Sequence, residues 1–238
     1  MSVFRTAQFG GEGRPENLKT IGRLILGQDN VGYSGITSVN QPGNQLAGID
    51  FKIITLEKNN LEFFSQIVGE DKGEQFLVPT KTFYNFGIGY FFPSTKYIDK
   101  LLLEYTNTKA YIKKKRGEFK NITYNHGVYK DGYRYYKKPI GSSIDADSAK
   151  LSFIYLRQFP KNNLLKIKYS AANINKNSNL KNYWGPEPRE IKALELSYSA
   201  QLTKRIELFF EYGIFEDDYL DKKINDQNLL IRIEYLVF

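Results

Sequence analysis

Apolar and polar residues alternate at every second position through most of this 238-residue chain. In one segment, Ile206, Leu208 and Phe210 fall on one face of an extended strand, and Glu207 and Glu211 fall on the other. Because successive side chains of a β-strand point to opposite faces, this period predicts two-sided strands. Ten such segments span residues 2–9, 46–56, 60–69, 82–92, 100–112, 148–159, 163–174, 190–203, 204–215 and 228–238.

The connections between these segments alternate between short and long. The long ones cover residues 10–45, 70–81, 113–147, 175–189 and 216–227. An up-and-down outer-membrane barrel has short periplasmic turns and long extracellular loops. We therefore predict an all-β fold, an antiparallel up-and-down transmembrane β-barrel of about ten strands in a single domain over 1–238. A soluble β-sandwich also alternates and is the competing fold.

The composition suits a wall between lipid and water. The chain holds 18 Tyr and 17 Phe, and tyrosine favours surfaces that are apolar at one end and wet at the other. No run approaches the roughly 18–20 apolar residues of a spanning helix. The absence of cysteine excludes disulfides and thiolate chemistry. The formal net charge of +8 would attract an acidic polymer.

The last segment, 228–238, ends the chain on Phe238. A terminal aromatic on a final strand is typical of bacterial outer-membrane barrels, whose assembly machinery reads that strand. The face of Phe238 also carries Glu234, whereas the better apolar face holds Leu229, Ile231 and Ile233. Either a bulge shifts the register near the end, or Phe238 points inward or sits at the periplasmic rim.

The first long connection contains a predicted short helix. Pro15 and Asn17 offer its start, and Gly27 follows its end. Its apolar stripe consists of Leu18, Ile21, Leu24 and Ile25.

Several segments of the connections resemble the capsule assembly Wzi family of outer-membrane barrels. They occur in the family's order between about residues 4 and 150, at 5–15, 25–30, 42–50, 66–71, 103–108, 124–135, 140–141 and 145–148. The resemblance implies a barrel with about twice this number of strands and a periplasmic helical plug. This chain would then be the C-terminal half, without the N-terminal strands, plug and signal peptide. Its last strand would close against a first strand that it does not contain.

The resemblance also implies a role for particular loop residues. A structural role in the loops is expected for Gly10, Gly11, Arg14, Asp29, Asn30, Gln45, Glu70 and Asp71. Gly10 to Arg14 lacks the Lys-Ser/Thr ending of a phosphate-binding loop. The acidic pairs Glu70–Asp71 and Asp145/Asp147 supply too few oxygens for Ca²⁺, so polar loop packing is expected. We predict no metal, no cofactor and no nucleic-acid partner.

Wzi proteins, the resemblance implies, help to anchor capsular polysaccharide at the cell surface through lectin-like outward loops. Sugars are bound by aromatic faces together with planar polar groups. One loop offers Tyr124, His126, Tyr129, Tyr133, Arg134, Tyr135 and Tyr136, and another offers Tyr183, Trp184 and Arg189. Basic runs at 113–116 and 137–138 could attract acidic saccharides. In the alternative interpretation the tyrosines form an interfacial belt and the lysines contact lipopolysaccharide or water.

Two other function classes compete with polysaccharide binding. A Ser–His hydrolase would have to use His126, the only histidine, with Ser142 or Ser143, but no nucleophile-elbow pattern accompanies them, so no enzyme is predicted. A porin for small solutes is the alternative function, because the strand charges should face the lumen and pair across strands. These inward charges are Glu62, Glu104, Glu195, Glu207, Glu211, Lys166 and Lys168.

Overall fold

The computed structural model describes residues 1–11, 13–26, 28, 35–55, 60–70, 81–112, 117–220 and 222–235. Its ten long strands are β1 (Ser2–Phe9), β2 (Gly43–Thr55), β3 (Leu61–Gly69), β4 (Lys81–Pro93), β5 (Ile98–Ile112), β9 (Ala149–Gln158), β10 (Leu164–Ile174), β11 (Arg189–Gln201), β12 (Ile206–Tyr219) and β13 (Lys222–Tyr235). The shorter elements are α1 (Leu18–Leu26), β6 (Gly117–Phe119), β7 (Arg134–Tyr135), β8 (Lys138–Pro139) and the 3-10 turn η2 (Pro160–Asn162).

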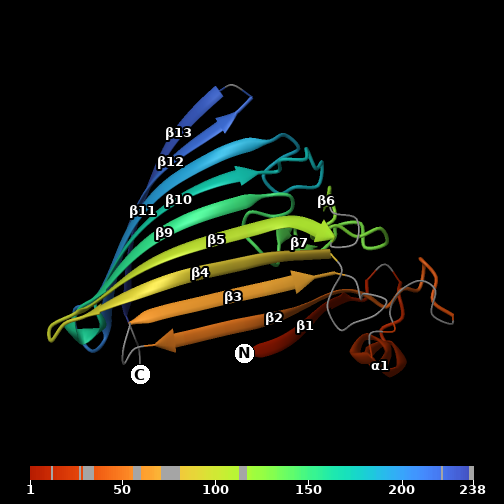
Figure 1. The fold of residues 1–238 in the computed structure, drawn as a ribbon, viewed down its shortest axis with the longest axis horizontal. Coiled ribbons are helices and arrows are strands. Elements are labelled where there is room, and N and C mark those ends of the chain that lie inside the picture. The colour runs from red at the N-terminus through yellow and green to blue at the C-terminus, as the bar shows by residue number, and fades with distance from the viewer. Residues whose placement is uncertain are drawn as a thin grey trace.

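Each long strand pairs antiparallel with the next one along the chain, from β1 to β13 (Figure 1). The short strand β6 pairs with β5, and β7 pairs with β8 in a separate hairpin. The ten strands therefore form one curved meander, which confirms the predicted up-and-down wall. The soluble sandwich is wrong, because the long strands form a single sheet. β1 and β13 stand at opposite ends of the strand order, so the sheet is not closed.

The predicted long connection at 216–227 is wrong. Strand β12 continues to Tyr219 and β13 begins at Lys222. Asp218 stands opposite Lys223 in the register, and the Arg189 guanidinium contacts the Asp217 carboxylate at 2.9 Å. Opposite charges on neighbouring strands stabilise a sheet. This stretch looks like a loop in sequence because it is charged, yet the charges are cross-strand partners.

One face of the sheet carries an unbroken apolar row, here called the apolar belt. Its members are direct cross-strand neighbours from β2 to β12: Ile53, Phe63, Ile88, Leu103, Phe153, Tyr169, Leu194 and Ile214. Most of these side chains are exposed. Soluble proteins rarely expose such a continuous apolar surface, whereas the outer band of a membrane barrel requires one.

The last strand joins this face. Leu229, Ile231 and Ile233 stand opposite Tyr212, Phe210 and Leu208, respectively, so the apolar alternation predicted for β13 is confirmed. Phe238 and the basic run 113–116 lie outside the described residues. No helix in the described ranges is both long and apolar enough to cross a membrane.

The opposite face is charged and its charges pair across strands. The Lys100 ammonium lies 3.0 Å from the Glu62 carboxylate, whose residue is only 4% exposed. On neighbouring strands, Lys168 contacts Glu195 at 2.7 Å. These contacts confirm the predicted cross-strand pairing for Glu62, Lys168 and Glu195. By the strand register, Glu104, Glu207, Glu211 and Lys166 share this face.

Gly89 allows the Lys100–Glu62 contact to form. Lys100 lies on β5 and Glu62 on β3, so the lysine side chain must cross the intervening strand β4. A Cβ atom at Gly89 would lie 3.0 Å from Lys100 Cε and 3.5 Å from Glu62 Cβ. The glycine therefore leaves the space through which the lysine passes.

The predicted helix is present as α1. The Asn17 side chain accepts a hydrogen bond from the Thr20 backbone N–H at 3.0 Å, which is the contact of a helix N-cap. At the other end, Arg5 donates to the Leu24 and Ile25 carbonyls. Of the apolar stripe, only Leu24 is buried.

We predict that Gly89→Val displaces Lys100 and leaves the buried Glu62 carboxylate with only its longer contact to Lys52, at 3.5 Å. The expected loss is roughly 1.5–3 kcal/mol of stability, the contribution of a hydrogen bond to a charged group. The measurement is the temperature at which the folded band shifts in unboiled electrophoresis of membrane fractions. Gly89→Ala is the matched control, because the flexible end of Lys100 can move by a few tenths of an ångström. Equal unfolding temperatures for the Val variant and the parent would contradict the prediction.

Candidate functional site

The long described connections gather at one end of the sheet (Figure 1). Residues 120–148, between β6 and β9, and residues 175–188, between β10 and β11, are here called the loop cap. The loop that contains α1 lies at the same end. The opposite end carries short turns such as η2. This arrangement agrees with the alternation of short and long connections in the sequence.

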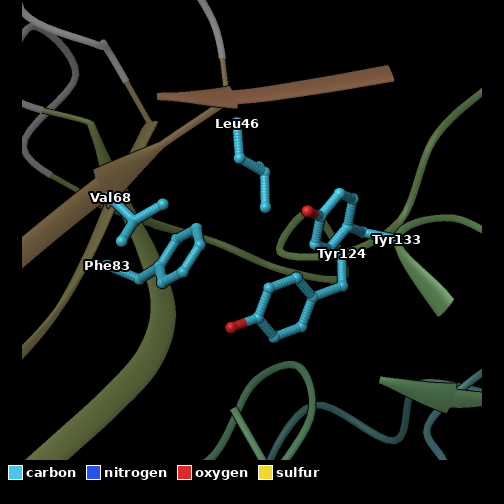
Figure 2. Close-up of a cluster of buried hydrophobic side chains, with 5 residues drawn as sticks. All are labelled: Leu46, Val68, Phe83, Tyr124 and Tyr133. Atoms are coloured by element: carbon cyan, nitrogen blue, oxygen red, sulfur yellow. The ribbon is translucent and has the colours of Figure 1, made fainter. Parts of the chain in front are cut away.

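The loop cap packs onto the charged, inner face of the sheet. Figure 2 shows Leu46, Val68 and Phe83, from β2, β3 and β4, directed toward Tyr124 and Tyr133 of the cap. The Phe83 and Tyr124 rings meet edge-to-face with centroids 5.3 Å apart. Burial raises the pKa of the Tyr124 hydroxyl well above its usual range, because a phenolate there would lose its solvation. These contacts seat the cap within the mouth of the wall.

A buried ion pair organises the cap. Arg134 is 4% exposed, and its guanidinium binds both Asp145 carboxylate oxygens, at 3.0 and 2.7 Å. The same guanidinium donates to the Tyr124 carbonyl and the Asn125 side chain. Asp145 also accepts a hydrogen bond of 2.7 Å from the Tyr183 backbone N–H. The pair therefore joins the two loops of the cap.

Further hydrogen bonds hold the cap together, within and between the loops. Asp147 accepts from the Asn121 backbone N–H of its own loop at 3.0 Å and from the Asn177 side chain of the other loop at 3.3 Å. The Trp184 indole donates to the Ser143 carbonyl at 2.9 Å. The polar loop packing predicted for Asp145 and Asp147 is thus confirmed. No cluster of three or more potential metal ligands occurs in the described part of the chain.

Four of the predicted ligand residues are buried inside the cap. Tyr124, Tyr129, Tyr133 and Arg134 are between 3% and 8% exposed. Tyr129 donates to the Pro42 carbonyl at 2.9 Å, and Tyr133 donates to the Thr6 hydroxyl at 2.7 Å. A ligand arriving from outside meets almost no surface of these four side chains, so their visible role is structural.

Two further candidates serve the loop backbone and the strand ends. The His126 Nδ1 accepts hydrogen bonds from the Val128 and Tyr129 backbone N–H groups at 3.2 and 3.0 Å. The histidine therefore has a hydrogen-bonding role within the loop. Arg189 opens β11, pairs with Asp217 and lies over the Tyr219 ring at 4.4 Å.

Four aromatic residues of the cap form two pairs, here together called the aromatic platform, and all but the half-buried Trp184 are exposed. Tyr135 and Tyr136 are 69% and 83% exposed and meet edge-to-face at 4.5 Å. Tyr183 and Trp184 meet in the same geometry at 5.7 Å. Tyr135 follows Arg134 in the chain, and Tyr183 is bound through its backbone to Asp145. The buried ion pair therefore fixes both pairs. The exposed aromatics could not be told from the buried ones in sequence.

Five of the residues with a predicted structural role in the loops lie in the described ranges. Gly10 and Gly11 have φ near +77°, which favours glycine, and the Gly11 N–H donates to the Glu16 carboxylate. The remaining contacts are Arg14 over the Tyr129 ring at 4.5 Å, Gln45 to the Leu24 carbonyl, and Glu70 to the Tyr124 N–H. Asp29, Asn30 and Asp71 lie outside the described residues.

Fold and cap together define a section of outer-membrane barrel wall whose long loops fold into the barrel mouth. The chain belongs to the capsule assembly protein Wzi family, whose model matches residues 1–228. The family membership confirms the resemblance seen in the loop segments, and with it the outer-membrane location expected for the chain.

Two relatives place this assignment in context. The solved structure of Wzi from Escherichia coli, described as an outer-membrane protein involved in group 1 capsule assembly and a carbohydrate-binding β-barrel, matches with a TM-score of 0.74 and 24% identity. The match covers 98% of this chain and 47% of that one, so the chain spans about half of that barrel. A 55.8 kDa protein from the cps region of Klebsiella pneumoniae is 41% identical over 75 residues, 30% of this chain and 14% of that protein.

We predict that Arg134→Leu opens the loop cap. The substitution leaves the Asp145 carboxylate buried without a counter-charge, which typically costs about 3–5 kcal/mol. Limited proteolysis of membrane fractions should then cut between 120 and 148 at least tenfold faster, with the strands still protected. Arg157→Leu at the base of β9 is the control, since it also removes an arginine from an ion pair but leaves the cap intact. A cap that is cut at the parent's rate would refute a central role for the ion pair.

Proposed function

We propose that this chain forms the surface-facing part of an outer-membrane barrel that binds capsular polysaccharide and retains it at the cell surface through the loop cap. The observation that carries the proposal is the aromatic platform, which presents Tyr135, Tyr136, Tyr183 and Trp184 on a rigid support. Membership of the Wzi family and the likeness to a carbohydrate-binding barrel support it.

The platform has the chemistry that a polysaccharide requires. Aromatic rings bury the apolar face of a sugar, and neighbouring polar groups accept and donate to its hydroxyls. Because the cap is already fixed by its buried hydrogen bonds, little ordering entropy is lost when a ligand binds. The proposed ligand residues are therefore the exposed Tyr135 and the half-buried Trp184, with Tyr136 and Tyr183 beside them. The role is binding, without a reaction.

Exposed lysines on the cap favour an acidic polysaccharide. Lys137 and Lys138 follow the Tyr135–Tyr136 pair directly and are exposed. On the other loop, the Lys181 ammonium donates to the Lys130 carbonyl at 2.7 Å, close to Tyr183 and Trp184 in sequence. A cationic rim raises the local concentration of an anionic polymer.

The other proposed partners are those of an outer-membrane strand wall. The apolar belt would contact outer-membrane lipid, lipopolysaccharide would surround the loop-bearing end, and the barrel assembly machinery would insert the protein. A porin is the second candidate, favoured by the charged inner face with its Glu62–Lys100 and Lys168–Glu195 pairs. The loop cap counts against it, because the cap packs across the inner face at the mouth. Conductance steps from the purified protein in planar bilayers would favour the porin.

We expect the double variant Tyr135→Ser/Tyr136→Ser to shed capsule into the medium. At about 1 kcal/mol lost per aromatic face, binding should weaken at least tenfold. The measurement compares cell-bound with released polysaccharide, with surface proteolysis to verify the cap. Leu180→Ser is the matched control, because Leu180 is an exposed apolar residue of the same cap without a ring. Full capsule retention by the double variant would defeat the proposed platform.

A further inference from the structure

A cavity of about 350 Å³ lies beneath the loop cap, on its inner side. The strands β1 to β5 and β9 form its walls, and the cap residues Tyr124, Tyr133 and Ser142 contribute its roof. Its volume falls within the roughly 300–1,000 Å³ of small-molecule sites. None of the aromatic platform residues lines this cavity, so the two are separate.

The polar lining of the cavity comes from three neighbouring strands. Asn85 on β4, Thr106 on β5 and Lys150 on β9 stand in one cross-strand row, and Glu104 lies two residues from Thr106 on the same face. Thr106 donates to the Asn85 side chain at 3.4 Å. Among the described residues, the Lys150 ammonium has one hydrogen-bond partner, the Ser143 hydroxyl at 3.5 Å, and it is attracted by the Glu104 carboxylate.

Glu104 adds a carboxylate to the lining. Within the described ranges it forms no hydrogen bond and no ion pair, and its charge attracts the neighbouring Lys150. Its oxygens are therefore open to hydrogen bonds from water or from a ligand that enters the cavity. The cavity therefore offers a strong acceptor, Glu104, beside a weakly engaged cation, Lys150.

The other side of the cavity is aromatic. Phe4 and Phe83 line it from the sheet, and Tyr124 and Tyr133 line it from the cap. Rings opposite a carboxylate, an ammonium and an amide form the combination that binds a sugar, whose C–H face is apolar and whose hydroxyls are polar. A purely apolar guest would leave Glu104 unsatisfied, and a simple anion would not use the rings.

We propose that this cavity is a second, inward-facing saccharide site, which binds a short unit entering from the barrel interior. The choice of ligand class rests on the proposed function, but the site does not share residues with the aromatic platform. Glu104 accepts hydrogen bonds from sugar hydroxyls, Lys150 pairs with an acidic substituent, and the half-buried ring of Phe4 contacts the sugar ring. The cap then separates two saccharide sites, one on each face.

The test uses the protein purified from membranes in detergent and oligosaccharides of two to four residues prepared from the source strain's capsule. Calorimetry should show two classes of site in the parent. Glu104→Gln and Lys150→Met should each weaken one class at least tenfold and leave the other unchanged. Glu211→Gln is the control, because Glu211 shares the inner face but not the cavity.

The fluorescence of Trp184, the single tryptophan of the chain, distinguishes binding at the two sites. Its fluorescence should respond to the outer site, so Tyr135→Ser/Tyr136→Ser abolishes the response and Glu104→Gln preserves it. One class of site that is lost only in the tyrosine variant would overturn the inner site and leave the proposed function standing. One class of site that is lost only in the Glu104 and Lys150 variants would overturn the aromatic platform and leave the inner site standing. No binding at all would overturn both sites.

Discussion

A strand that crosses hydrocarbon must pair every backbone N–H and C=O group with another strand, since lipid offers no alternative partner. The continuous antiparallel ladder from β1 to β13 meets this requirement between its two outermost strands. The same requirement fixes the register, because a shift by one residue would turn Glu62 and Lys168 toward lipid and the apolar belt inward. The side-chain pattern and the ladder therefore specify the same wall.

The inner face and the loop cap both contain buried charges, and each pairs them in a different way. On the strands, charges are paired across short distances, and Gly89 lets Lys100 reach a partner two strands away. In the cap, one guanidinium satisfies a carboxylate and several loop acceptors at once. Burying such a pair contributes little net stability, but breaking it is costly, so it makes one loop arrangement strongly preferred.

The strands could be predicted from sequence because their alternation is local. The predicted segment 2–9 coincides with β1, and most other bounds differ by a few residues. The prediction for 216–227 was wrong because charged residues suggest a loop when the partner strand is unknown. In the cap, the sequence could not show which tyrosines are exposed, because Tyr133 is buried by a contact with Thr6, 127 residues away, while Tyr135 is exposed. Local sequence does not distinguish the two tyrosines.

The Arg134–Asp145 pair has a mechanical consequence. In the proposed function, a long polymer held at the cell surface would be dragged by flow, and the load would enter the protein at the side chains that hold it. Tyr135 adjoins Arg134, and the Tyr183 amide is bound to Asp145, so a pull on either loop is shared by both. From there it passes into β9, β10 and β11, whose many parallel hydrogen bonds must shear together before the wall yields. Force on a few surface residues is thereby transmitted along the strands, the direction in which the sheet best resists shear.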